Sequence, residues 1–164
     1  MKTIRLTALI GACMILCICG CTSKQGDQLT EKQKEQIKKE IITVYDSIFS
    51  KLEKLDVEQS CQYYTPDCMV FGSDGEQTSF QDYKKWGIDV YKSATSYKWI
   101  SSGPVFISIT RDVVLISLDG RNETLMNSGK MFVTEPSHYT WAFKKTNGQW
   151  KLFYHHFSGA FLNK

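Results

Sequence analysis

Hydrophobic residues follow a helical period in the first half of the chain. Between Thr30 and Leu55 apolar side chains recur every three or four positions, which predicts an amphipathic helix of about 24 residues opened by a capping box. Asp56 is a capping residue for a second, short helix that ends before Pro66, and Ser79 opens a third. One side of the third helix is predicted to carry Phe80, Tyr83, Trp86, Gly87 and Val90.

The second half of the chain alternates with the period of two that is typical of strands. Residues 67–72 form a short early strand, and from Tyr97 onward alternating segments include residues 113–118 and 130–145. Asn147-Gly148 is the strongest hairpin signal in the chain. Helices followed by an antiparallel meander predict an α+β fold, with the helices packed on one face of the sheet.

The last hairpin can be given a residue-by-residue register. If Asn147 and Gly148 form a two-residue loop, Thr146 pairs with Gln149 and the next pairs follow one for one. One face of the hairpin then carries the pairs Phe143–Leu152, Trp141–Tyr154 and Tyr139–His156. This aromatic face is expected to be the concave one, covered by helices. His156 would point inward and His155 outward, so the two could not bind one metal ion, and no metal site is predicted.

The end of the chain resembles a known family. Gly148-Gln149-Trp150-Lys151-Leu152 followed by His156 and Ser158 resembles SnoaL-like domains of the nuclear-transport-factor-2-like, or cystatin-like, cone fold. The resemblance spans residues 30–161. It implies three N-terminal helices packed on a strongly curved antiparallel sheet, a conical pocket, and frequent dimers across the sheet. Some members of the superfamily are isomerases, cyclases or dehydratases, whereas many are non-catalytic binding or association modules.

The N-terminus reads as a targeting segment. A basic start is followed by an apolar run over residues 6–19 that is too short for a transmembrane helix, as in a signal peptide. Ile18-Cys19-Gly20-Cys21 resembles a bacterial lipobox, which predicts lipidation at Cys21; a plain secretory signal is the alternative. Thr22 in the next position does not favour inner-membrane retention, so we expect a lipid anchor in the bacterial cell envelope, at the outer membrane. The predicted divisions are a signal peptide 1–20, a lipidated tether 21–29 and a domain 30–164.

Composition narrows the choice of partners. The formal net charge of the 164 residues is only +3, which argues against nucleic-acid binding, and 13% aromatic residues are too many for a disordered tail.

Cys61 and Cys68 are the cysteines that lie beyond the lipobox-like segment. They could form a disulfide in an oxidising compartment, or remain buried free thiols, and the sequence leaves both open.

These features predict a membrane-anchored domain whose aromatic pocket binds a small apolar or aromatic ligand without a cofactor. The candidate ligand-binding residues are His156, Tyr154, Tyr139, Trp141, Tyr45 and Trp86. An isomerase, cyclase or dehydratase using His156 is an alternative. It is disfavoured because no Asp or Glu occurs between Lys145 and Lys164 to assist the histidine. A second alternative is a dimeric protein-interaction module, and a homodimer is expected in any case, with a seam drawn from Phe153, Phe157, Val105 or Phe106.

Overall fold

A computed structural model describes residues 28–163, so the predicted signal peptide and the predicted lipidation site Cys21 lie outside the described residues. The elements are α1 (Glu31–Leu52), α2 (Val57–Cys61), β1 (Tyr64–Phe71), β2 (Gln77–Thr78), α3 (Phe80–Lys92), β3 (Ala94–Ile109), β4 (Val113–Met126), β5 (Met131–Thr146) and β6 (Gln149–Asn163). No helix among the described residues is both long enough and apolar enough to span a bilayer.

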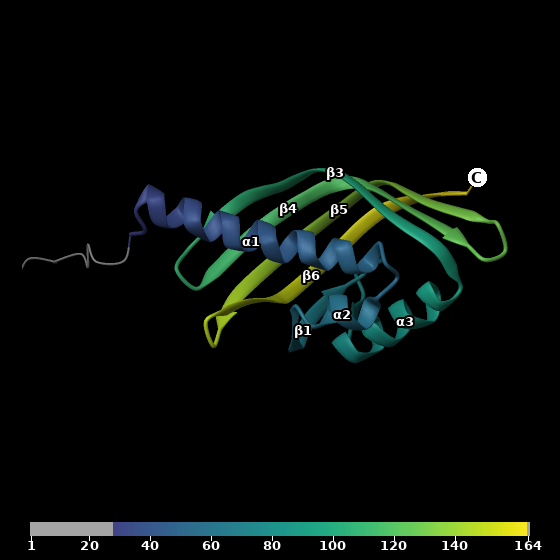
Figure 1. Cartoon of the computed structure of the whole chain (residues 1–164), viewed down its shortest axis with the longest axis horizontal. Helices are drawn as coiled ribbons and strands as arrows, with labels where there is room; N and C mark the ends of the chain where they lie inside the picture. The colour runs from purple at the N-terminus through teal and green to yellow at the C-terminus, as the bar shows by residue number, and fades with distance from the viewer. Residues whose placement is uncertain (1–27, 164) are drawn as a thin grey trace, which may run out of the picture.

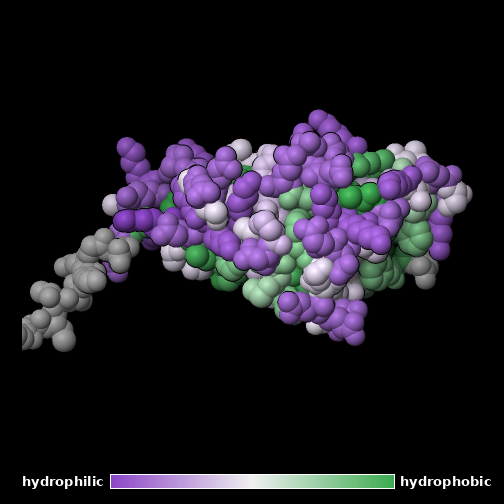
Figure 2. Space-filling model, turned by 90° about the horizontal axis from the view of Figure 1, so that it is seen from below, coloured by the Kyte–Doolittle hydropathy of each residue, from purple (hydrophilic) through white to green (hydrophobic). Residues whose placement is uncertain are grey.

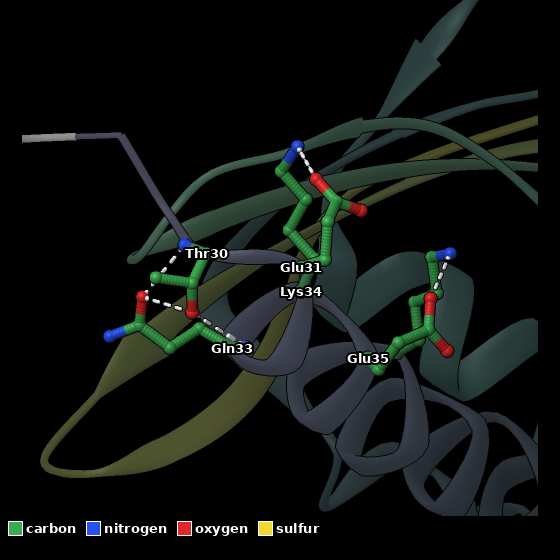
Figure 3. Close-up of polar contacts among 6 residues, drawn as sticks. Thr30, Glu31, Gln33, Lys34 and Glu35 are labelled. Atoms are coloured by element: carbon green, nitrogen blue, oxygen red, sulfur yellow. Dashed lines mark hydrogen bonds and ion pairs between the residues drawn. The ribbon is translucent and has the colours of Figure 1, made fainter.

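Helix α1 begins as predicted. The backbone N–H of Gln33 donates to the Thr30 hydroxyl at 3.3 Å, and the Gln33 side chain accepts from the Thr30 N–H at 2.8 Å (Figure 3). This reciprocal capping box satisfies two of the N–H groups that a helix start leaves without partners. Glu31 pairs with Lys34 on the solvent side of the first turns. The residues that α1 buries are Ile37, Ile41, Tyr45, Ile48 and Phe49.

The α+β, nuclear-transport-factor-2-like fold is confirmed. Six strands form one sheet in the order β2-β1-β6-β5-β4-β3, and the three helices lie on the same side of it, with α1 running along the hollow of the curved strands (Figure 1). The sheet is not entirely antiparallel as predicted, because β1 pairs in parallel with β6. The C-terminal strand β6 lies between β5 and the early strand β1. Its parallel pairing with β1 joins distant segments, so no local turn signal could predict it.

The register of the β5–β6 hairpin is confirmed only near its turn. Thr146 pairs with Gln149, and the predicted pairing holds as far as Phe143 and Leu152. Beyond this point a β-bulge gives β6 one extra residue at Phe153. The pairs then become Ala142–Tyr154, Trp141–His155, Thr140–His156 and Tyr139–Phe157.

The bulge exchanges the two faces of β6. Because side chains alternate, a shift of one residue turns His155 toward the helices and places Tyr154 and His156 on the outer face. The prediction that His156 points into the interior was therefore wrong. The run Phe153-Tyr154-His155-His156-Phe157 carries no polar–apolar alternation that could have revealed the bulge.

Element boundaries differ from the prediction around Pro66. Helix α2 ends at Cys61, and β1 already begins at Tyr64, before the proline. The pairing of β1 with β6 is irregular between Tyr64 and Met69, so Pro66 sits where the ladder needs no N–H donor. This irregularity allows β1 to contain a proline, a residue that normally interrupts a strand.

Candidate functional site

A cavity of about 390 Å³ lies between the helices and the inner face of the sheet. Its volume falls within the roughly 300–1,000 Å³ of typical small-molecule pockets. Among the described residues that line it, none is Asp, Glu, Lys or Arg. Most are aromatic or aliphatic, and the aromatic ones are Phe49, Tyr64, Tyr83, Trp86, Tyr91, Tyr97, Phe132, Tyr139, Trp141, His155, Phe157 and Phe161.

The cavity has a closed inner end and an open mouth. Trp141, His155 and Tyr64 are buried at the inner end. Trp86 on α3 and Phe161 near the end of β6 also line the cavity but are 60% and 64% exposed. The mouth therefore lies between α3 and the far ends of the last strands, at the right of Figure 1.

His155 is the imidazole of the cavity, and it is uncharged. Its side chain is only 2% exposed, and its Nδ1 lies 3.2 Å from the Tyr64 hydroxyl. Burial, with a smaller contribution from charge on His156, lowers the pKa of His155 to about 3. Tyr83, Tyr139 and other rings surround it, and no carboxylate among the lining residues could stabilise an imidazolium. At neutral pH His155 is a neutral hydrogen-bonding group.

A second polar cluster is centred on Asn122 of β4. The Tyr97 hydroxyl donates to Asn122 Oδ1, while Asn122 Nδ2 donates to Tyr139 Oη and to Ser137 Oγ, each at 2.9 Å. Ser137 in turn donates to the Thr134 carbonyl. These bonds satisfy polar groups that would otherwise be costly to bury. Burial raises the pKa of Tyr139 to about 12, so its hydroxyl stays protonated.

The structure brings together three of the six predicted ligand-binding residues. Tyr139, Trp141 and Trp86 line the cavity. Tyr45 is buried but does not line it, because its hydroxyl accepts a hydrogen bond from Trp99 Nε1 at 2.8 Å. The predictions for His156 and Tyr154 were wrong in placement, since the bulge puts both on the outer face of the sheet.

The predicted dimer-seam residues and the two cysteines can also be compared with the structure. Phe157 lines the cavity and Phe106 packs against the core, so neither belongs to a seam on the outer face, whereas Val105 is exposed there. Cys61 and Cys68 are both buried and are free thiols in this structure.

Several lining residues escaped the sequence analysis. The second helix was predicted to continue almost to Pro66, which would include Tyr64, whereas in the structure Tyr64 begins β1 and lines the cavity. Asn122 could have been found as a polar residue at an inward position of β4, had the strand been extended past Leu118. His155 was hidden by the bulge, although the adjacent histidine was proposed.

Comparison with known proteins identifies the family. A model of the SnoaL-like domain matches residues 41–162. The chain belongs to the SnoaL-like domain family. A search of curated proteins gives no match.

Solved structures with the same fold are numerous, and their sequences are distant. A nuclear transport factor 2-like superfamily protein from Salmonella enterica serovar Typhimurium is 15% identical, with a TM-score of 0.66 over 76% of this chain and 92% of that one. A hexachlorocyclohexane dehydrochlorinase of type 3 from Novosphingobium barchaimii LL02 is 10% identical, with a TM-score of 0.68 over 82% and 94%. A candidate scytalone dehydratase from Novosphingobium aromaticivorans is 12% identical, with a TM-score of 0.71 over 81% and 91%. At these identities the likeness establishes the fold alone.

Proposed function

We propose that this SnoaL-like domain binds a small, neutral and largely apolar ligand in its aromatic cavity and does not transform it. The observation that supports this is the lining itself, which combines aromatic walls with two small polar clusters and carries no charged side chain. An ionised ligand buried there would lack a counter-charge, which is costly, whereas an aromatic ring would gain contact on every side. The Tyr64–His155 pair and the Asn122 cluster would orient a polar substituent.

Catalysis is less well supported by the same residues. Dehydratases and dehydrochlorinases remove a proton during elimination, and some of the fold's solved structures carry such names. His155 is the lining residue suited to that role, but an imidazole with a pKa of about 3 is a weak base. No lining carboxylate would stabilise the charge that proton abstraction creates. The geometry therefore favours binding.

Isothermal titration calorimetry with 2-naphthol, a neutral bicyclic phenol, tests the proposal. We expect saturable binding to one site per chain. Val90→Phe should weaken it, because Val90 lines the cavity and the larger ring would occupy part of it. The matched control is Tyr154→Ala on the outer face, which should bind like wild type. Equal binding by the two variants, or no binding of 2-naphthol and related neutral aromatics, would refute the proposal.

We also propose a lipid anchor at Cys21 in the bacterial envelope, at the outer membrane. The support is the basic and apolar leader followed by the lipobox-like Ile18-Cys19-Gly20-Cys21. Growth with radiolabelled palmitate should label the wild-type protein but not Cys21→Ser. Labelling of both would contradict the assignment of this cysteine.

A homodimer through the outer sheet face is the remaining proposal. Val105 on β3 is 60% exposed, and Met69 and Val113 are also exposed, which gives this face an apolar character. Sedimentation equilibrium should show a dimer at micromolar concentration and a monomer for Val105→Lys. A wild-type monomer would remove this proposal and leave the cavity unaffected.

A further inference from the structure

The mouth of the cavity is surrounded by exposed aromatic side chains. Trp86 comes from α3, Phe132 from the start of β5 and Phe161 from the end of β6, and all three line the cavity. They are 60%, 38% and 64% exposed. Figure 2 shows hydrophobic residues gathered toward the centre and right of the molecule, while the end where α1 begins is mostly hydrophilic. We call these three residues the aromatic rim.

We propose that the aromatic rim docks on a lipid bilayer and that the cavity receives its ligand from the membrane. This inference rests on the proposed ligand binding. Tryptophan and phenylalanine are the side chains that favour the membrane–water interface, and inserted rings bury apolar area that is otherwise exposed to water. Because the rim residues also line the cavity, a docked rim would join the cavity to the hydrocarbon region without an aqueous gap.

The charges near the rim are compatible with such a surface. The Lys130 ammonium lies 4.6 Å from the centre of the Phe132 ring, where it can reach lipid phosphates while the ring inserts. On α3 the exposed Asp89 pairs with Lys92 at 3.8 Å, but Lys84 and Lys85 directly precede Trp86, so positive charge remains beside the rim. Attraction to anionic lipid would therefore add to the insertion of the rings, and neutral phosphatidylcholine vesicles isolate the contribution of the rings.

The tether allows this orientation. Segment 21–29 would span at most about 30 Å when fully extended. Helix α1, which starts at the end of the tether, has 22 residues and is therefore about 33 Å long. With an anchor at Cys21, the domain can lie with its long axis along the membrane and bring the mouth to the surface.

Tryptophan fluorescence of the full-length protein in phosphatidylcholine vesicles tests the docking. The chain has four tryptophans, and Trp99, Trp141 and Trp150 are buried, so Trp86 is the one whose emission should respond to lipid. We expect a blue shift of this emission and its quenching by lipids brominated on the acyl chains. Trp86→Phe supplies the background from the other three. A lipid anchor alone does not bring Trp86 into contact with acyl chains.

Phe132→Ser and Phe161→Ser should each lower the ratio of docked to undocked protein about tenfold, because each removes a ring from the inserted area. The matched control is Ile107→Ser, which changes a 57% exposed apolar residue beside Glu31 and Lys34 at the start of α1 and should quench like wild type. Absence of quenching above the Trp86→Phe background, or equal quenching by the Phe and Ile variants, would overturn the docking. So would a concentration-dependent blue shift without vesicles, which would assign the rim to self-association.

Titration of 2-naphthol without vesicles separates this inference from the proposed function. Binding of 2-naphthol without quenching of Trp86 would overturn the docking and leave the cavity's role intact. Quenching without 2-naphthol binding would leave a docked rim but remove the ligand proposal.

Discussion

The buried neutral His155 makes stability depend on pH in a way that can be isolated. Its pKa is lowered from the ordinary 6.5 to about 3 in the folded protein, so between these values the unfolded chain binds a proton that the folded chain does not. Folding is therefore weakened as the pH falls below about 6.5. At pH 5 the difference of about 1.5 pH units corresponds to a loss of about 2 kcal/mol from this residue.

Urea denaturation followed by circular dichroism at pH 7.5 and pH 5 measures this loss. Between pH 7.5 and pH 5 the free energy of unfolding of the wild type should fall by about 2 kcal/mol more than that of His155→Gln. Glutamine does not titrate, and it can still accept a hydrogen bond from Tyr64. The carboxylates are common to both proteins, so their contribution cancels in the difference. His156→Gln, changed on the outer face, should keep most of the wild-type dependence. The reasoning is refuted if wild type and His155→Gln depend equally on pH, or if His156→Gln abolishes the dependence instead.

Three further substitutions probe the fold by equilibrium unfolding. Thr30→Ala removes the capping box and should cost about 1 kcal/mol; an unchanged midpoint would show that the cap does not contribute. Asn122→Ala leaves the Tyr97 and Tyr139 hydroxyls without their shared partner and should cost about 2–3 kcal/mol, whereas a loss below 0.5 kcal/mol would argue against a tight cluster. Gly120→Ala would bring a Cβ to 2.5 Å from the Trp99 ring, so we expect a loss of several kcal/mol, and near-wild-type stability would contradict this close packing.

The features that the sequence predicts correctly are those whose structure depends on a few neighbouring residues. The capping box at Thr30 and the Asn147-Gly148 turn each depend on a few adjacent residues, and both were identified correctly. The face of α3 that carries Trp86 and Val90 was also recognised, because a helix repeats every 3.6 residues whatever surrounds it. Local chemistry was sufficient at each of these positions.

The sequence analysis placed side chains wrongly where their positions depend on contacts with distant parts of the chain. The bulge at Phe153 shifts the register of β6 against β5, and a run of aromatic residues fits equally well on either face, so the local sequence does not reveal the shift. Tyr45 was predicted to bind the ligand, but it does not line the cavity, and its hydroxyl accepts a hydrogen bond from Trp99, 54 positions away. The cavity was therefore anticipated in its aromatic character, and its histidine was missed by one position.

The parallel pairing of β1 with β6 has a consequence for how the protein is made. Tyr64 and His155, which meet at the inner end of the cavity, are 91 positions apart, and the Glu40 carboxylate on α1 accepts a hydrogen bond from Trp150 on β6. The chain must therefore be almost fully synthesised before either contact can form, and such high contact order slows folding. Until β6 is inserted, the apolar faces of α1 and β1 remain open to aggregation or to a chaperone. Truncation before residue 150 would remove β6, and with it His155, Phe157 and Phe161 from the cavity wall, so the cavity could not form.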